Sequence, residues 1–195
     1  MGAYYLGISG SPRKDGNTDV AVREALNAIS GAGAETRFIR IYDCHIDNCL
    51  GCRECMSLGR CVIQDDDVEE LLETLRKSSG AIIGAPVYWD GPPGKMKDFI
   101  DRSHGYYASR PGDLLSGLNF CLISVATASG FEPHEDVMRS WIEYYGARMI
   151  EGVRIYAREK GDLPKRAGEL MKARQCGLKL FQKRQGQYKP TLEET

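Results

Sequence analysis

Short apolar runs and amphipathic stretches follow one another along this chain in a regular alternation. The apolar runs have the length of strands buried in a sheet, and the amphipathic stretches have the apolar spacing of surface helices. Such an alternation is typical of a parallel sheet with helices on both of its faces. The pattern predicts strands over residues 3–9, 35–42, 80–85, 119–125 and 147–157, and helices over residues 18–30, 67–77, 95–104, 133–145 and 163–184.

The length and the charge of the chain limit the number of domains and the classes of partner. Its 195 residues correspond to one domain, which we expect over residues 1–184 with a cysteine-rich loop at 43–64 and a polar tail at 185–195. Lysine and arginine number 26 against 27 acidic residues, and this balance disfavours nucleic acid or an anionic membrane as a partner. The N-terminus lacks the basic start and long apolar run of a signal peptide, so we expect a cytoplasmic protein.

The segment from Gly7 to Thr18 joins a predicted buried strand to the start of a predicted helix. At such a junction, free backbone N–H groups and the helix dipole favour a phosphate. Hydroxyl, amide and guanidinium groups that can add to such a site are carried by Ser9, Ser11, Arg13, Asn17 and Thr18. The simpler alternative is a turn in which Asn17 or Thr18 only caps the helix. The segment matches neither a Walker loop nor the G-x-G-x-x-G fingerprint, which disfavours ATP and Rossmann-bound dinucleotides.

Four of the seven cysteines fall within one short stretch. Cys49, Cys52 and Cys55 are three residues apart and Cys61 follows six positions later, so the four thiols can converge on one centre. In a reducing compartment such a cluster indicates a metal site more than a disulfide framework. Four thiolates suit either zinc or a 4Fe–4S cluster, and the spacing resembles ferredoxin ligation without matching it. The remaining alternative is a set of reduced thiols that shape the loop or respond to oxidants.

Two motifs, in their order along the chain, resemble the NADPH-dependent FMN reductase branch of the flavodoxin-like proteins. The first, with Pro12 inside the stretch from Ser9 to Thr18, is similar to the FMN phosphate loop of that family. The second runs from Pro86 to Arg102 and is similar to the loop that cradles the isoalloxazine ring and the helix that follows it. The resemblance implies a flavodoxin-like fold, α/β and doubly wound, with a five-stranded parallel sheet of order 2-1-3-4-5 and non-covalently bound FMN.

The resemblance also implies which residues hold the flavin. The phosphate would lie against the first motif, and the ring would lie against Pro86, Val87, Tyr88 and Trp89. The two aromatic side chains suit a flat ring, although packing in a core or an interface is their more ordinary use. In the loop after the fourth strand, Thr127 and Ser129 are expected to complete the pocket.

The cysteine spacing is similar to that of the iron–sulfur flavoproteins, a subgroup of the same family. This similarity implies that Cys49, Cys52, Cys55 and Cys61 ligate a 4Fe–4S cluster. It implies an FMN-dependent oxidoreductase that moves electrons between FMN and the cluster, assembled as a homodimer or homotetramer. NAD(P)H or ferredoxin would be the electron donor and a small molecule the acceptor, and the sequence identifies neither.

Other functions remain open on the sequence alone. They are a cluster-free NAD(P)H-dependent FMN or quinone reductase, a flavodoxin-type carrier, and a zinc-stabilised interaction module with a flavodoxin-like fold. The net charge of −1 disfavours the carrier, since such carriers are strongly acidic. Outside these sites, we expect Cys121 and Cys176 to be structural, Cys44 to be a spare thiol, and His134 to be solvated at the start of a helix.

Overall fold

The computed structural model describes residues 3–105 and 113–184, and the predicted tail at 185–195 lies outside these residues. Its strands form one sheet in which every neighbouring pair is parallel, in the order β2-β1-β3-β4-β5. The predicted flavodoxin-like topology is therefore confirmed. The strands are β1 (Tyr4–Ser9), β2 (Glu35–Arg40), β3 (Ala81–Pro86), β4 (Asn119–Ala126) and β5 (Arg148–Tyr156).

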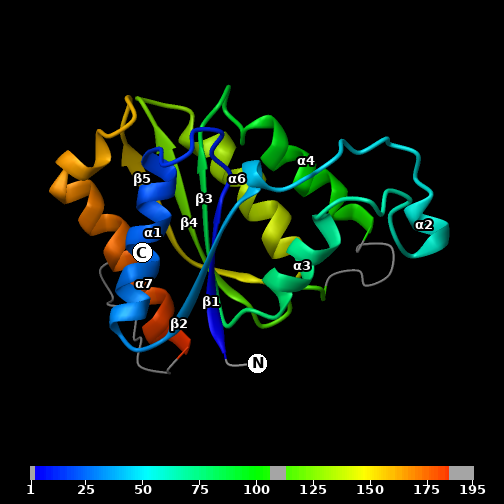
Figure 1. The fold of residues 1–195 in the computed structure, drawn as a ribbon, viewed down its shortest axis with the longest axis horizontal. Helices are drawn as coiled ribbons and strands as arrows, with labels where there is room; N and C mark the ends of the chain where they lie inside the picture. Colours follow the sequence, from blue (N-terminus) through cyan, green and yellow to red (C-terminus); the bar gives the residue numbers. More distant parts are fainter. Residues whose placement is uncertain (1–2, 106–112, 185–195) are drawn as a thin grey trace.

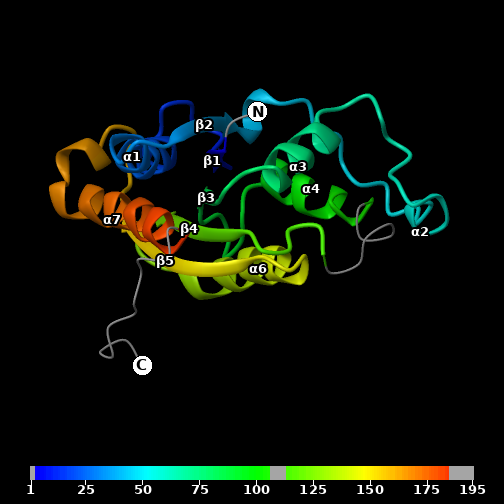
Figure 2. The same cartoon turned by 90° about the horizontal axis from the view of Figure 1, so that it is seen from below.

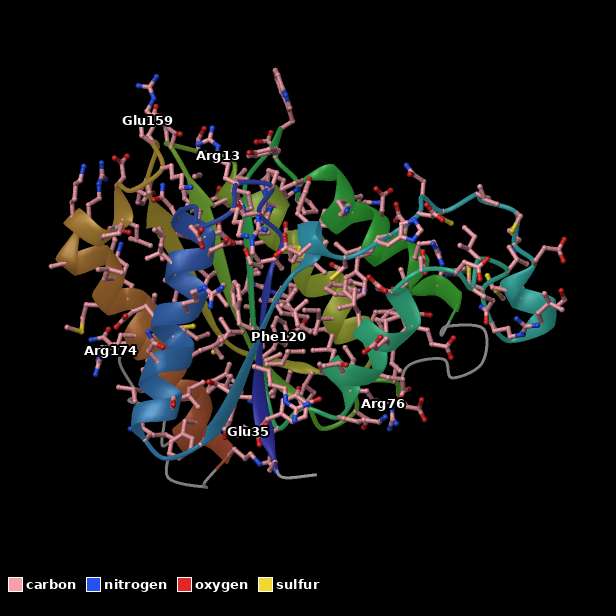
Figure 3. All side chains as sticks on the ribbon, in the orientation of Figure 1. Arg13, Glu35, Arg76, Phe120, Glu159 and Arg174 are labelled. Atoms are coloured by element: carbon pink, nitrogen blue, oxygen red, sulfur yellow. The ribbon has the colours of Figure 1, made fainter. Side chains whose placement is uncertain are left out.

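Helices cover both faces of the sheet (Figure 1). One face packs against α1 (Asn17–Gly31) and α7 (Ala167–Arg184), and the other against α3 (Val68–Arg76), α4 (Gly94–Arg102) and α6 (Phe131–Tyr144). Successive side chains of a strand point to opposite faces, so Ile82 joins the first core while its neighbour Ile83 joins the second. Phe120 lies in the middle of the second core (Figure 3).

The central strands are buried on both faces, which explains their continuous apolar sequences. Every residue of β1 is buried, whereas the edge strand β2 alternates between exposed and partly buried positions. The chain leaves β2 two residues earlier than predicted and forms a 3₁₀ turn, η1 (Ile41–Asp43). The C-terminal helix is also shorter than predicted. A separate 3₁₀ turn, η2 (Leu163–Lys165), precedes α7 because Arg166 leaves the helical region with φ −114° and ψ 80°.

The loops that follow the parallel strands gather at the carboxyl end of the sheet (Figure 1). The cysteine-rich segment behaves differently, because it extends sideways from the body beside α3 and α4 and carries the short helix α2 (Cys55–Leu58) (Figures 1 and 2). The two regions singled out by the sequence thus lie on different parts of the molecule. No helix among the described residues is long and apolar enough to cross a membrane.

Candidate functional site

A cavity of about 110 Å³ lies at the carboxyl end of the sheet, between the loops that follow β1, β3, β4 and β5. Most of the residues predicted from the flavin motifs line it: Ser11, Arg13, Asn17, Thr18, Pro86, Val87, Tyr88 and Thr127. Ser9, Pro12, Trp89 and Ser129 do not line it. Arg158, which does, was not predicted, although its place directly after the last strand is the signal that could have revealed it.

The loop after β1 makes a tight turn into α1. Gly16 is the residue before the helix, and its N–H donates to Arg13 O at 2.9 Å. A Cβ at Gly16 would come within 2.8 Å of the same oxygen, so the turn requires glycine here. No side chain of the described residues caps the helix, which excludes the simple role of Asn17 or Thr18 as a cap. The amides of the first helical turn are therefore available to a ligand.

Asn17 ties this turn to the segment after β5. Its Nδ2 donates to Glu159 O at 2.9 Å, and its Oδ1 accepts the N–H of Leu163 at 3.1 Å. Arg13 Nη1 adds a contact to Arg158 O at 3.3 Å. Arg13 and Glu159 accordingly lie near each other at the carboxyl end of the sheet (Figure 3). The amide of Asn17 thus has a structural task that the sequence does not indicate.

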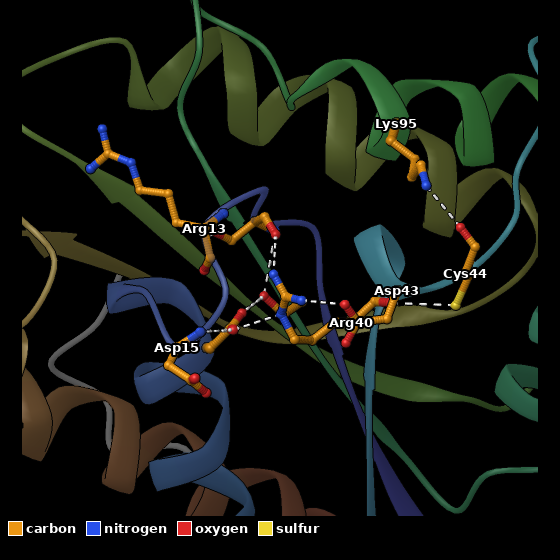
Figure 4. Close-up of polar contacts among 9 residues, drawn as sticks. Arg13, Asp15, Arg40, Asp43, Cys44 and Lys95 are labelled. Carbon is orange, nitrogen blue, oxygen red and sulfur yellow. Dashed lines mark hydrogen bonds and ion pairs between the residues drawn. The ribbon is translucent and has the colours of Figure 1, made fainter.

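A buried polar network lies beneath the turn (Figure 4). Asp19 accepts Ser9 Oγ at 2.5 Å, the N–H of Asp15 at 2.8 Å, and Arg40 Nε at 2.7 Å. Arg40 also donates from Nη2 to Ser11 O at 3.1 Å. Asp19 and Ser9 are fully buried, so the Ser9 hydroxyl serves the loop rather than the cavity.

The same arginine continues the network toward the cysteine-rich segment. Arg40 Nη1 pairs with Asp43, and Arg40 O accepts the Cys44 thiol at 3.3 Å. Lys95, in the first turn of α4, donates to Cys44 O at 2.8 Å (Figure 4). Burial, followed by the charges of Asp67 and Asp43, raises the pKa of Cys44. Cys44 therefore anchors the start of the segment as a neutral thiol, and it is not among the residues that line the cavity shared by Cys49, Cys52, Cys55 and Cys61.

The loop after β3 folds back on itself as a two-residue turn. Tyr88 and Gly91 exchange both backbone hydrogen bonds, at 2.8 and 3.1 Å. The two residues between them, Trp89 and Asp90, have φ of +49° and +61°, in the left-handed region that a type I′ turn needs. Tyr88 borders the cavity, whereas the side chain of Trp89 is fully exposed to solvent.

His134 is buried beside this turn, which corrects the expectation of a solvated side chain. The helix α6 begins at Phe131, earlier than predicted, and His134 lies on the buried face of this helix together with Phe131 and Met138, where it is 0% exposed. Burial lowers the pKa of its imidazole, and the neighbouring backbone of Gly91 opposes that shift. Neither ring nitrogen reaches hydrogen-bonding geometry with any described residue.

The four clustered cysteines line a second cavity, of about 70 Å³, at the end of α4. Three residues with positive φ, Gly51 at +63°, Arg53 at +61° and Gly59 at +67°, bend the loop around it. Burial raises the pKa of Cys55, and the charges of Cys61, Cys52 and Cys49 raise it further, in that order. The donor set fits a soft metal centre in its chemistry. Within residues 3–105 and 113–184, however, no three His, Cys, Asp or Glu side chains are already arranged to hold a metal ion.

Arg102, the last residue of α4, holds both ends of the cysteine-rich segment. Its guanidinium pairs with Asp66 and donates to Asp47 O at 2.9 Å and Ile63 O at 3.1 Å. Burial opposes the charge of Asp66, but hydrogen bonds from Arg102 and from the N–H groups of Asp47 and Val68 hold its pKa below the usual value. Asp66 and Arg102 are both nearly inaccessible to solvent.

The two remaining cysteines are structural, as expected. Cys121 in β4 and Cys176 in α7 are both buried, and the Cys121 thiol donates to Cys176 O at 3.4 Å. A hydrogen bond with Cys121 and burial together raise the pKa of Cys176 well above its ordinary value. Both side chains therefore serve the packing of α7 on the sheet.

The sequence matches the profile of the NADPH-dependent FMN reductases over residues 4–161. The chain belongs to this family. Within it, the chain groups with the iron–sulfur flavoproteins, since it is 33% identical to one from Archaeoglobus fulgidus over 94% of this chain and 81% of that protein. Membership of this family places it among the flavin-dependent oxidoreductases.

A second relative is an iron–sulfur flavoprotein of Methanocaldococcus jannaschii, 48% identical over 98 residues, which is 50% of each chain. That alignment therefore spans only about half the length of the relative. Among solved structures, an NADH:FMN oxidoreductase in its apo form superposes with a TM-score of 0.67 and 17% identity, covering 97% of this chain and 92% of that one. This likeness supports the fold.

Proposed function

We propose that the chain is an FMN-dependent oxidoreductase that binds FMN non-covalently at the carboxyl end of its sheet. The observation that carries this proposal is the cavity in which the start of α1 meets the loop after β3. These are the two elements that the motifs assign to the phosphate and to the ring. When bound, FMN supplies hydride and single-electron chemistry that side chains lack.

The residues around the cavity divide into three roles. The first-turn amides of α1 and the guanidinium of Arg13 hold the phosphate. Pro86, Val87 and Tyr88 border the ring, and Thr127 closes the cavity from the loop after β4. The volume of about 110 Å³ is below the ~300 Å³ of an enclosed small-molecule pocket. The cavity is therefore too small to enclose FMN, and part of a bound FMN would extend beyond it.

The second part of the proposal assigns a 4Fe–4S cluster to Cys49, Cys52, Cys55 and Cys61. Its support is that all four thiols line one small cavity, together with the names of the relatives. A cluster there supplies one-electron chemistry. Around it the chain contributes the left-handed turns that bring the thiols together, and the apolar residues Leu50 and Val62 that also line the cavity.

The cofactor content of anaerobically purified protein tests both parts. We expect one FMN per chain with about four irons and matching acid-labile sulfide. Zinc in place of iron, with no flavin, would replace the proposal with the zinc-stabilised interaction module. Protein that binds neither iron nor flavin after reconstitution would refute it.

The phosphate site is tested by comparing Arg13→Ala with Lys14→Ala. Both residues are exposed basic side chains of the same loop, but only Arg13 lines the cavity. Affinity for FMN should fall about tenfold or more in Arg13→Ala and stay unchanged in Lys14→Ala, as one charge-assisted hydrogen bond is lost. Riboflavin, which lacks the phosphate, should bind both variants equally. An equal loss for riboflavin would show that Arg13 does not contact the phosphate.

A cluster-free NAD(P)H-dependent FMN or quinone reductase is the second candidate. It is favoured by the observation that the thiols are not already arranged around a metal in the described residues. Replacing Cys49 and Cys52 by serine separates the two functions. Unchanged steady-state NAD(P)H oxidation with an added quinone would favour the cluster-free enzyme, and loss of that electron transfer with FMN retained would favour the cluster.

The electron donor and acceptor remain proposals that rest on the resemblance to the family. NAD(P)H or ferredoxin would donate, and a small molecule would accept. We also propose a homodimer or homotetramer, because several large apolar side chains of the cysteine-rich segment are exposed: Leu50, Met56, Leu58 and Val62. Light scattering of the holoprotein tests the assembly. A monomer would refute the proposed assembly.

A further inference from the structure

Nearly all the N–H donors of the Arg102 guanidinium are engaged in hydrogen bonds. An arginine has five N–H donors, two on each Nη and one on Nε. Nη1 donates to Asp47 O at 2.9 Å and to Asp66 Oδ2 at 2.5 Å, and Nη2 donates to Ile63 O at 3.1 Å and to Asp66 Oδ1 at 3.2 Å. These four bonds leave the Nε–H as the fifth donor.

That fifth donor is buried and has no hydrogen-bond partner among the described residues. A buried N–H without a partner costs free energy, and native structures leave few of them. The side chain of Arg102 is only 1% exposed, so bulk water does not reach it. The acceptor that completes this donor must therefore lie in the cavity beside it.

The cavity beside Arg102 is the one lined by the four cysteines. Arg102 and Cys61 line it together, and both also line a neighbouring cavity of about 260 Å³. A third residue shows how closely Cys61 approaches the end of α4. A Cβ on Gly105 would lie 3.0 Å from the backbone nitrogen of Cys61 and 3.2 Å from its Cβ. Cys61 thus packs directly against the turn that follows Arg102.

We propose that, when the four cysteines hold a 4Fe–4S cluster, Arg102 Nε donates an N–H···S hydrogen bond to the sulfur of Cys61. This inference rests on the proposed function, and it names Arg102 as a positioning residue of the cluster. A ligated sulfur is an acceptor of the kind the buried donor lacks. Reduction adds negative charge to the cluster, so a cationic N–H donor stabilises the reduced form more and raises the reduction potential.

The contacts at the two ends of α4 make this helix the element that connects the two candidate sites. The helix begins directly after the loop that borders the flavin cavity, and Lys95 in its first turn holds Cys44 O at 2.8 Å. Its last residue, Arg102, holds Asp47 near the start of the cysteine-rich segment, and Ile63 and Asp66 at its end. A rigid helix therefore fixes the position of the cysteines relative to the flavin loop.

The first test compares Arg102→Lys with Lys97→Gln in anaerobically purified holoprotein. The lysine keeps the positive charge but removes Nε and the fork. Lys97 is the control, since it is a partly exposed cation on the same helix and its ion pair, among the described residues, is with Asp101. The readouts are iron and FMN content and the midpoint potential of the cluster, followed by EPR.

In Arg102→Lys we expect FMN to remain and the cluster to become harder to reduce. At a fixed potential, its oxidised-to-reduced ratio should rise about tenfold, a shift of about 59 mV for a one-electron couple. Lys97→Gln should match the unaltered protein. An unchanged cluster potential in an iron-replete Arg102→Lys variant would overturn the inference.

A second measurement needs no variant at this position, and it decides the matter if Arg102→Lys loses its cluster. Protein labelled with ¹⁵N-arginine is reduced and examined by pulsed EPR. A ¹⁵N coupling to the cluster is expected, and it should persist in Arg53→Lys, since Arg53 is the other arginine that lines the cavity. Iron-replete protein without this coupling would overturn the inference about Arg102 and leave the cluster assignment intact. Protein with FMN but without iron would instead refute the cluster itself.

Discussion

Arg40 and Asp19 form a buried ion pair, with 2.7 Å between Arg40 Nε and Asp19 Oδ2. Their side chains are only 4% and 1% exposed, directly beneath the turn between β1 and α1. Because the aspartate also accepts from Ser9 and Asp15, the pair fixes the shape of that turn. The arginine supplies the positive charge that a buried carboxylate needs next to a phosphate site.

Replacing Arg40 should therefore lower the free energy of unfolding much more than replacing an exposed arginine. We expect Arg40→Gln to lower the free energy of unfolding by about 3–5 kcal/mol, because it leaves Asp19 buried without its partner. Arg37→Gln, on the same strand, breaks an exposed pair with Glu35 and should cost at most about 1 kcal/mol. Urea unfolding of the apoproteins measures both, and equal losses would contradict the role of the buried pair.

The crossing of α1 and α7 depends on one glycine. A Cβ on Gly177 would lie 2.2 Å from Ala25 O, and that atom belongs to the backbone. Gly177→Ala should therefore separate the helices and lower the free energy of unfolding by about 1–3 kcal/mol. Gly168→Ala, in the first turn of α7, meets nothing within 4 Å and should be neutral or stabilising by up to about 1 kcal/mol. Thermal unfolding distinguishes the two, and similar effects would argue against the close crossing.

Acidic pH should lower the free energy of unfolding through the protonation of His134. Burial holds the pKa of this imidazole below its unfolded value of about 6.5, so the unfolded chain binds more protons between the two values. The contribution of His134 to stability is complete above about pH 6.5 and decreases as the pH falls toward the folded pKa.

Urea unfolding at about pH 7.5 and about pH 5.5 measures this effect. The loss of stability on acidification should be smaller in His134→Gln than in the unaltered protein. His45, whose side chain is 63% exposed, provides the control, and His45→Gln should retain the full loss. The same pH dependence in both variants would show that another group is responsible.

Trp89 should affect stability and flavin binding in opposite directions. Its φ of +49° costs about 1–2 kcal/mol for a residue with a Cβ, and its fully exposed side chain returns no packing energy. We expect Trp89→Gly to raise the free energy of unfolding of the apoprotein by about 0.5–1 kcal/mol. The motif resemblance assigns the Trp89 indole to the flavin ring, so the same variant should bind FMN more weakly. Trp89→Phe should keep both the strain and an aromatic ring. A less stable Trp89→Gly apoprotein would contradict the strain argument.

The alternation of apolar and amphipathic stretches was sufficient to predict a parallel sheet with helices on both faces, and the resemblance of the two motifs to a known family supplied the order of its strands. Alternating apolar runs determine a doubly wound sheet, and such a sheet brings the ends of its parallel strands to one edge, so the loops at 9–18 and 86–89 meet there. The spacing of the four cysteines likewise indicated that they would share one cavity.

Only the tertiary structure decided which buried polar groups are paired. Arg40 reaches Asp19 across 21 positions, Arg102 reaches Asp66 across 36, and Asn17 reaches Leu163 across 146. Periodicity reports which face of its own element a residue occupies, and it gives no information about a partner on another element. His134 is a related case: α6 begins at Phe131, two residues earlier than predicted, so His134 lies on the buried helical face with Phe131 and Met138 and not at an exposed helix start.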